Sequence, residues 1–429
     1  MERDDTIRGA TAGATALLLA LGGASGALHA QELRFTCYSD GNECEVMDDM
    51  LDRLEAEEDG LTVTVDTVPY QAILENLPVQ LAAGTGPDLA KVTDLGGLHE
   101  YYLDIAPYVD AGYWEDSFGD VLDWYRGGPD DEGIYGLHSQ LTLTGAYANT
   151  TLFEQAEVEL PGDDATWDDW AAATREVAEK TGTAFPMAMD RSGHRIAGPA
   201  ISNGAKLFDE AGEPILVDEG FTDFVTKFVG WNEDGTMAPE VWGTSGGTTY
   251  ADATEEFINA ELVYYYSGSW QTARLDDTIG DAFDWQVVGT PCGPAACSGM
   301  PGGGGVVGIG ATEHPEAVAK VLDFFAEKDN YAELAARTLN IPAHVAVAAE
   351  GVDFQTDSEN TKRALQAWSA EVPKLSPVAF AYQGYANNRA MYDITVERIS
   401  QALTGEMTVD EAMDRAKDDL AKAMTAVGQ

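Results

Sequence analysis

Lysine and arginine are scarce in this chain. Its 429 residues include 24 Lys and Arg against 74 Asp and Glu, so the formal net charge is −50. Binding to nucleic acid or to an anionic membrane requires basic side chains that displace counterions from phosphates. The composition therefore argues against both classes of partner. Disorder is excluded as well, because 17 Tyr, 14 Phe and 9 Trp are too many large apolar side chains to leave unburied.

Cysteine is equally rare, with four residues in the whole chain. They form two close pairs in the sequence, Cys37 with Cys44 and Cys292 with Cys297. Four cysteines allow three disulfide connectivities, but short spacing in an exported chain favours pairing within each close pair. Zinc would need C-x2-C spacing or a neighbouring His, and neither pair has these. We expect two local disulfides and no metal site.

Histidine and recognisable catalytic motifs are also lacking. After residue 30 there are five His in the sequence, none in an H-E-x-x-H motif or a close pair. A glycosidase could use two carboxylates, but acidic pairs occur throughout this chain by chance and single out no site. The sequence thus favours neither a metalloenzyme nor any other enzyme.

Two glycine motifs match nucleotide or nucleophile signatures only superficially. Residues 303–308 fit G-x-G-x-x-G, but they follow a loop rich in Cys and Pro and run into a strand-like segment. Residues 243–247 fit G-x-S-x-G without the strand, turn and helix of a nucleophile elbow. We predict no nucleotide cofactor and no catalytic serine.

Long hydrophobic runs are absent except near the N-terminus. Residues 10–28 are the most continuous apolar stretch, with Arg3 and Arg8 before it and Ala30 at its end. Its core is too short and too rich in glycine to span a bilayer. We predict a signal peptide over residues 1–30, cleaved near Ala30, and hence a periplasmic protein; the alternative is a disordered leader.

Regular alternation of strand and helix patterns follows the leader. Residues 32–38 and 61–65 alternate in the manner of strands, residues 45–58 and 70–83 have amphipathic helical spacing, and residues 87–94 predict a third strand. Strands separated by helices imply a parallel, doubly wound sheet.

The rest of the chain keeps this α/β character and becomes helical at its end. Residues 135–153 contain two strand-like runs before a helix, and residues 221–242 predict one long helix. Thr166 with Asp169, and Thr408 with Glu411, predict capping boxes at helix starts. Residues 291–305 are rich in Pro, Gly and Cys, so we place a crossing between lobes there.

The order of seven segments resembles family 1 extracellular solute-binding proteins, the sugar-capturing subunits of ABC importers that are similar to maltose-binding protein. The segments are LAAGTGPDL (81–89), GLHSQLTLTGAYANTTLFEQAEV (136–158), TWDDW (166–170), FINAELVYYYSGSW (257–270), GGGGVVGIGATEHPEAVAKVLDFF (302–325), NIPAHVAV (340–347) and ALTGEMTVDEA (402–412). The resemblance implies a two-lobe periplasmic-binding-protein (Venus-flytrap) fold with hinge-crossing segments and a helical C-terminal part. It places residues 31–143 plus 300–349 in the N-terminal lobe and residues 144–299 plus 350–429 in the C-terminal lobe.

The resemblance also implies a function without catalysis. A neutral saccharide or glycoside would bind between the lobes, which close because only the closed form lets the ligand contact both. The closed protein, as a monomer, would deliver the sugar to a membrane permease. A binding protein for a polyol or glycerol-linked glycoside is the alternative of the same class. A secreted carbohydrate-active enzyme and a surface adhesion protein are alternatives of other classes.

Aromatic and polar residues at the ends of predicted strands form the candidate site. Ligands of open α/β sheets lie beyond the carboxyl ends of strands, and aromatic rings with Asp, Asn, Gln and Arg suit a ligand rich in hydroxyls. The ends of predicted strands supply Tyr38, Asp40, Asn42, Thr93, Asp94 and Trp270. For Trp270 the alternative is that the ring packs in the hydrophobic core and does not contact a ligand. By resemblance the site also includes Gln140, Arg195 and Gly304. The family's C-terminal aromatic would fall near Tyr382, Tyr385 or Asn388, and we include Tyr385 and Asn388 in the site. The two cysteine pairs depart from the family pattern and are expected to narrow or rigidify the cleft.

The excess of carboxylates is explained without any specific site, as a heavily hydrated surface that keeps the protein soluble in high salt. We hypothesise that the source lives in a saline habitat. Screening by salt should then relieve self-repulsion, so the melting temperature should rise steeply between low and molar NaCl. A melting temperature that stays flat over this range would contradict the hypothesis.

Overall fold

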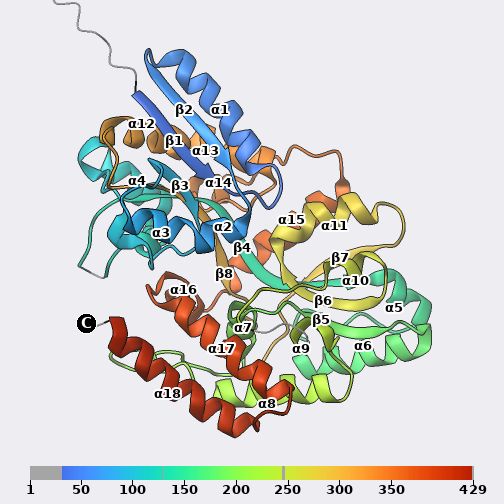
Figure 1. Cartoon of the computed structure of the whole chain (residues 1–429). Coiled ribbons are helices and arrows are strands. Elements are labelled where there is room, and N and C mark those ends of the chain that lie inside the picture. Colours follow the sequence, from blue (N-terminus) through green and yellow to red (C-terminus); the bar gives the residue numbers. More distant parts are fainter. Residues whose placement is uncertain (1–30, 129, 244–246, 428–429) are drawn as a thin grey trace, which may run out of the picture.

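The computed structural model describes residues 31–128, 130–243 and 247–427, which form two α/β lobes (Figure 1). The predicted signal peptide lies outside the described residues. Strands are joined in the order β2-β1-β3-β8-β4-β6-β5, and β7 also pairs with β4. Their bounds are β1 Gln31–Cys37, β2 Leu61–Thr67, β3 Leu89–Val92, β4 Gly136–Asn149, β5 Phe185–Met189, β6 Leu262–Gly268, β7 Trp285–Gly289 and β8 Pro301–Gly308.

Strand β4 belongs to both lobes. Its residues 136–143 pair antiparallel with β8 in the N-terminal lobe, called the first lobe from here on. Its residues from Thr144 onward pair antiparallel with β6 and β7 in the C-terminal lobe, called the second lobe. The sequence predicted two separate strand-like runs here, and that prediction is wrong. The backbone stays extended over 14 buried residues, because only the hydrogen-bonding partner changes between Leu143 and Thr144.

The first three strands confirm the predicted parallel arrangement. β1 pairs in parallel with β2 and β3, and alternate β1 residues Leu33, Phe35 and Cys37 are buried. The arrangement does not extend further, because β8 returns from the second lobe and lies antiparallel to β3. The sheet of the first lobe is therefore mixed.

Helices cover both lobes, and α17 and α18 form the red C-terminal part of Figure 1. None of the helices in the described part of the chain is long and apolar enough to cross a membrane. The α-helices are α1 Glu43–Glu57, α2 Tyr70–Glu75, α3 Leu77–Ala82, α4 Ala111–Phe118, α5 Thr150–Ala156, α6 Trp167–Thr181, α7 Gly193–Ser202, α8 Glu219–Glu233, α9 Glu240–Gly243, α10 Thr254–Ile258, α11 Thr272–Ile279, α12 Pro315–Ala326, α13 Lys328–Thr338, α14 Val345–Glu350, α15 Glu359–Glu371, α16 Pro377–Gly384, α17 Asn388–Leu403 and α18 Val409–Val427. Short 3₁₀ segments are η1 His99–Tyr101, η2 Ala106–Tyr108, η3 Gly119–Tyr125, η4 Ser269–Gln271 and η5 Val372–Lys374.

Two helices are shorter than the sequence predicted. The helix expected over residues 70–83 is divided into α2 and α3, because Pro78 in the first turn of α3 cannot continue the preceding helix. The helix expected over residues 221–242 ends at Glu233. Gly235 then adopts a φ of 80°, and the chain turns back so that Met187 of β5 donates a backbone hydrogen bond to Thr236.

The predicted disulfides and helix caps are present. Cys37 is bonded to Cys44 and Cys292 to Cys297, with Cα atoms 5.8 Å and 3.9 Å apart respectively. Both capping boxes form: the side chain of Thr166 accepts from the Asp169 N–H, and Thr408 does the same for Glu411 at the start of α18. Local sequence signals therefore placed these features correctly.

Thr144 gives a test of the partner exchange in β4. Its Oγ1 accepts a hydrogen bond from Met300 N–H at 2.7 Å and lies 3.2 Å from the hydroxyl of Tyr266, all buried. Thr144→Val removes the acceptor of the buried Met300 N–H, whereas the Tyr266 hydroxyl keeps Thr290 Oγ1 at 3.4 Å, and should lower the free energy of unfolding by about 1–3 kcal/mol, measured by urea denaturation.

Thr174→Val in α6 is the matched control. Thr174 is equally buried, but its hydroxyl donates to a helix carbonyl at Trp170 that the helix itself satisfies, so we expect a loss well under 1 kcal/mol. Equal losses in the two variants would contradict a special role for Thr144.

Candidate functional site

The loop between β1 and α1 carries the first group of predicted site residues. The Cys37–Cys44 disulfide closes the loop into a ring, in which Tyr38 is buried and Asp40 is exposed. Within the ring, Glu43 Oε2 accepts hydrogen bonds from the backbone N–H groups of Asp40 and Gly41, both at 3.0 Å. The covalent bond and these contacts together fix the backbone that presents Asp40.

Gln140 of β4 connects this loop to the strand shared by both lobes. Its Nε2 donates to Asp40 Oδ2 at 3.0 Å and to Glu43 Oε1 at 3.3 Å. Desolvation by the surrounding protein raises the pKa of Asp40, Lys91 lowers it and Glu43 raises it further. The structure therefore brings the predicted residues Asp40 and Gln140 together, and the side-chain amide of Gln140 is shared by the carboxylates of Asp40 and Glu43.

Tyr70, at the start of α2, is a site residue that the sequence did not identify. The helical pattern assigned it to a buried stripe, yet its side chain is 36% exposed. Its ring lies 5.0 Å from that of Tyr38, and its hydroxyl lies 3.0 Å from Thr93 Oγ1. A signal was available, because Tyr70 follows the carboxyl end of β2, at the edge where β1 and β3 also end.

Asp94, just after β3, faces the C-terminal helix α17. Burial raises the pKa of Asp94, while the charge of Arg389 and a hydrogen bond from Gly97 N–H lower it, and Asp393 raises it. Arg389 and Asp393 both belong to α17. The loop of the first lobe is thus electrostatically coupled to a helix that the sequence analysis associated only with Asn388.

Asp190 organises the second lobe's side of the site. This fully buried carboxylate, directly after β5, accepts hydrogen bonds from Tyr250 (2.7 Å), Tyr265 (2.8 Å) and Ser267 (2.6 Å). Arg195 Nε lies 3.7 Å from it. Burial nevertheless dominates and raises the pKa of Asp190 to about 6, against the lowering by Arg195 and the hydroxyl donors.

Arg195 occupies a face of the predicted stacking residue Trp270. Its guanidinium carbon is 4.2 Å from the Trp270 ring centroid, and Trp270 is half-buried, so this ring is not a plain core residue. Arg195 Nη1 lies 2.7 Å from His194 Nδ1, whose own pKa falls to about 3 mainly through burial. The neutral imidazole accepts from Arg195 and donates Nε2–H to Pro301 O, which ties Arg195 to the start of β8.

Several buried side-chain atoms in this region have no hydrogen-bond partner among the described residues. They are Asp94 Oδ1, Gln140 Oε1, Arg195 Nε and Tyr392 Oη, from both lobes. Burial raises the pKa of Tyr392, whose ring packs 5.4 Å from that of His194, so its hydroxyl stays protonated. Donors and acceptors are mixed, which suits hydroxyl groups because each hydroxyl both donates and accepts.

Two predicted site residues of the first lobe, Asn42 and Gly304, contact other parts of the protein. Asn42 is exposed and donates Nδ2–H to Arg337 O at 3.2 Å. A Cβ at Gly304 would lie 2.6 Å from the Tyr38 hydroxyl, so glycine is required here by protein packing. Their contact with a ligand stays a prediction.

The structure does not bring Tyr385 and Asn388 together with the residues above. The Tyr385 ring packs 5.3 Å from that of Phe208 and its hydroxyl contacts Met424 of α18. Asn388 is buried and donates to the backbone carbonyls of Tyr382 and Gln383. α17 reaches the site instead through Arg389 and Tyr392.

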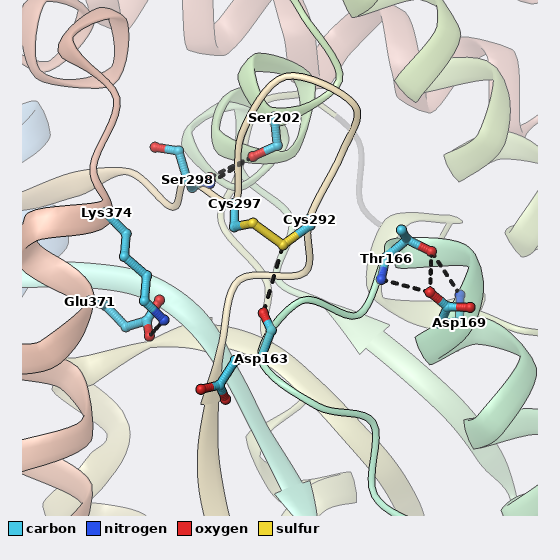
Figure 2. Close-up of a disulfide and its surroundings, with 9 residues drawn as sticks. All are labelled: Asp163, Thr166, Asp169, Ser202, Cys292, Cys297, Ser298, Glu371 and Lys374. Carbon is cyan, nitrogen blue, oxygen red and sulfur yellow. Dashed lines mark hydrogen bonds and ion pairs between the residues drawn. A yellow bond between two sulfur atoms is a disulfide. The ribbon is translucent and has the colours of Figure 1, made fainter.

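The second disulfide lies at the opposite end of α7 from Arg195. Figure 2 shows Cys292–Cys297 beside Ser202, the last residue of α7, whose Oγ accepts a hydrogen bond from Ser298 N–H. Arg195 and Ser202 are seven residues apart in this helix, a rise of about 10 Å. This disulfide therefore anchors the segment before β8. It does not border the candidate site, whereas Cys37–Cys44 does.

Comparison with protein families decides what kind of protein carries this site. Residues 49–362 match the model of the bacterial extracellular solute-binding proteins. The chain belongs to this family. The resemblance inferred from the sequence is thereby confirmed, and the members of the family are binding proteins rather than enzymes.

Individual relatives are distant. A binding protein of Brucella abortus (strain 2308) is 24% identical over 86% of each chain. An arabinooligosaccharide-binding protein of Bacillus subtilis (strain 168) is 25% identical over 44% of each chain. The structure of the ABC substrate-binding protein Lmo0181 from Listeria monocytogenes in complex with cycloalternan has a TM-score of 0.77 at 18% identity, covering 92% of this chain and 99% of that one. The two-lobe fold is thus confirmed.

The raised pKa of Asp190 makes a prediction about stability. A carboxyl with a pKa of about 6 in the folded protein and about 4 when unfolded binds its proton more tightly in the folded state. Its contribution is fully present below pH 4 and is lost as the pH rises to 6. Wild type should lose about 2–3 kcal/mol more than Asp190→Asn between pH 4 and pH 7 in urea denaturation.

Asp168→Asn controls for the general effect of removing one negative charge from this acidic lobe. Asp168 is exposed and pairs only with Lys227 at the surface, so its variant should follow the wild-type pH curve. A curve for Asp190→Asn that runs parallel to wild type would show that Asp190 titrates normally.

Proposed function

We propose that this solute-binding protein captures a neutral oligosaccharide between its two lobes and delivers it to the permease of an ABC importer, without chemical conversion. Carbohydrate and permease are the expected partners, and the protein is expected to act as a monomer. No cofactor enters this function.

The observation that carries the proposal is the presence of aromatic faces and uncommitted polar atoms on both lobes. Tyr70 is exposed on the first lobe, and Tyr250 and Trp270 lie on the second beside Asp190 and Arg195. Sugars combine an apolar C–H face, which packs on aromatic rings, with hydroxyls that need directional polar partners. Both requirements are met here.

The comparisons support a saccharide, and most of the sugars that they name are oligosaccharides, although a similar structure from Thermotoga lettingae is bound with alpha-D-tagatose, a monosaccharide. The Listeria protein binds cycloalternan, and the Bacillus relative is named for arabinooligosaccharides. Neither is similar enough to transfer its ligand to this chain. A polyol or glycerol-linked glycoside remains the second candidate, because the same polar groups would bind its hydroxyls.

We infer that the lobes move about three crossing segments. Residues 31–143 plus 300–349 would form one lobe, and residues 144–299 plus 350–429 the other. The partner change in β4 after Leu143, opposite Pro301 of β8, supports the first two boundaries. Gln355 donates a backbone hydrogen bond to Ala336 O of the first lobe. We therefore move the third boundary from residue 349 to a point beyond Gln355.

Periplasmic location is part of the same proposal. The family is extracellular, and two disulfides are stable only in an oxidising compartment. We propose export by the signal peptide with cleavage near Ala30. Mass spectrometry of the mature N-terminus from the exported protein tests this point.

Isothermal titration against maltotriose, arabinotriose, cycloalternan and glycerol tests the binding function, with chromatography of each sugar after incubation. We expect saturable binding to at least one oligosaccharide, weaker binding of glycerol, and unchanged sugar. A hydrolysed sugar would instead identify a carbohydrate-active enzyme, and preferential binding of glycerol would favour the polyol alternative. Absence of binding to all of them would contradict the proposal.

Tyr70 and Trp270 are the aromatic residues we expect to contact the sugar. Tyr70→Ala and Trp270→Ala should each remove stacking worth about 1–2 kcal/mol, and so weaken the affinity for the tightest-binding oligosaccharide of this panel roughly five- to thirtyfold in calorimetry.

Tyr108→Ala is the matched control for these variants. Tyr108 is comparably exposed, at 45%, but lies in η2 of the first lobe, away from the strand ends that form the site. Its variant should bind like wild type. If Tyr70→Ala and Trp270→Ala also bind like wild type with intact circular dichroism spectra, neither ring contacts the sugar.

A further inference from the structure

Just beyond β5 the chain carries an arginine that is buried in the second lobe. Arg191 directly follows Asp190, and only 1% of its surface is exposed. The carboxylate of Asp190 pairs with Arg195 instead, and the described part of the chain shows no ion pair between Arg191 and an Asp or Glu. A buried guanidinium is costly unless its N–H groups find acceptors, so the groups around it need an explanation.

Backbone carbonyls of one surface segment, residues 247–251, supply these acceptors. Arg191 Nη1 donates to Thr249 O and Nη2 donates to Gly247 O, both at 2.6 Å. The backbone N–H of Arg191 donates to Ala251 O at 2.8 Å. Every second carbonyl of segment 247–251 is therefore bound to the same residue.

The side chain of Arg191 also reaches helix α17. Its Nη2 donates to Ser400 Oγ at 3.0 Å, whereas Nε has no partner among the described residues. A guanidinium is planar and offers its N–H donors in a fixed fork, so it binds two carbonyls at once, which the single ammonium of a lysine does not reproduce. Arg191 thus holds segment 247–251 against the end of β5 and against α17.

Segment 247–251 carries Tyr250, whose hydroxyl is anchored while its ring is open to solvent. The hydroxyl donates to Asp190 Oδ2 at 2.7 Å, yet 43% of the side chain is exposed. The same carboxylate lies 3.7 Å from Arg195 Nε, and Arg195 stacks on Trp270. An aromatic ring that is fixed at one end and exposed on its face suits the apolar C–H face of a sugar.

We propose that Arg191 is a positioning residue whose guanidinium holds segment 247–251 by its carbonyls, so that Tyr250 presents a fixed aromatic face to the sugar. The guanidinium does not contact the sugar itself, because Arg191 is buried. That the Tyr250 ring stacks on a sugar rests on the proposed function; the hold of Arg191 on the segment does not.

Fixing the segment before the sugar arrives strengthens the binding. A surface segment that becomes ordered only on binding loses conformational entropy at that moment, and this loss weakens the affinity. Arg191 removes the loss through main-chain contacts, since Gly247 and Thr249 contribute only their carbonyl oxygens to it. The hold therefore does not depend on which side chains these two positions carry.

Hydrogen exchange in the absence of sugar tests the hold on the segment. Arg191→Lys keeps the positive charge but loses the fork of donors. Mass spectrometry should show that the backbone amides of residues 247–251 exchange about tenfold faster than in wild type, while those of β5 and β6 keep their rates. If Arg191→Lys does not fold, Arg191→Gln replaces it. Unchanged exchange of the segment would overturn the hold.

Arg398→Lys is the matched control. Arg398 lies in α17 of the same lobe, its side chain is 14% exposed, and it pairs with Asp419 of α18. The substitution again changes a largely buried arginine to lysine, but residues 247–251 should exchange as in wild type. Equal acceleration in Arg191→Lys and Arg398→Lys would show that the segment responds to any such change in the lobe, and would overturn the specific hold by Arg191.

A double-mutant cycle of affinities tests the link between Arg191 and Tyr250. Arg191→Lys, Tyr250→Ala and the double variant are titrated calorimetrically with maltotriose, or with arabinotriose if maltotriose does not bind to wild type. Tyr250→Ala should weaken binding roughly five- to thirtyfold through lost stacking. Arg191→Lys should weaken it about three- to tenfold when Tyr250 is present and leave it unchanged in Tyr250→Ala. An equal loss in both backgrounds would overturn the positioning role.

The outcomes separate this inference from the proposed function. Faster exchange of residues 247–251 in Arg191→Lys, together with unchanged sugar binding by Tyr250→Ala, supports the hold but overturns the contact of Tyr250 with the sugar. Weaker binding by Tyr250→Ala, together with unchanged exchange in Arg191→Lys, overturns the role of Arg191 and leaves the proposed function standing. If wild type binds none of the sugars, the proposed function fails, and the exchange rates alone decide the hold.

Discussion

The continuity of β4 is the constraint on which this architecture depends. One strand supplies the last hydrogen-bonded neighbour of β8 in the first lobe and the neighbours of β6 and β7 in the second. Neither sheet can therefore be displaced along the strand without breaking a ladder. The residues around the point where β4 changes its pairing partner are also tightly packed. A Cβ at Gly145 would lie 2.6 Å from the Trp368 side chain, and one at Gly299 would lie 2.3 Å from Thr144 O. The lobe motion proposed above would therefore have to bend the chain near this point rather than slide one sheet along β4.

The same junction concentrates the few cations of a very acidic protein. Carboxylates outnumber basic residues about three to one in the chain. Near the candidate site, Arg195 lies beside Asp190, and the charge of Arg389 lowers the pKa of both Asp94 and Asp393, which burial raises. Such local balance fits an uncharged ligand, because a charged one would leave a partner exposed or uncompensated.

Sequence reasoning worked where structure is decided by neighbours in the chain. The alternation of Leu33, Phe35 and Cys37 predicted β1, the spacing of the cysteines predicted both disulfides, and Thr408 predicted the start of α18. It failed where distant segments decide. The unity of β4 depends on pairing with residues more than 100 positions away, and no local turn signal marks that exchange.

The candidate site shows the same limit. Asp40 and Gln140 were predicted, and they meet in the structure. Tyr70 was missed because helical periodicity assigns it to a buried stripe, and the importance of Asp190 was missed because its partners Tyr250 and Ser267 lie at least 60 positions away. Tyr385 was placed by resemblance alone, at a position where the alignment did not fix the corresponding residue, and its ring packs against Phe208.

The stacking of Arg195 on the Trp270 ring would affect the measured affinity for a sugar. If a sugar stacks on that face, the guanidinium has to leave it, so the measured affinity reports an exchange of one stacked partner for another. Selectivity among sugars could then evolve by adjusting how firmly the arginine is held by Asp190 and His194, with every side chain that touches the sugar left unaltered.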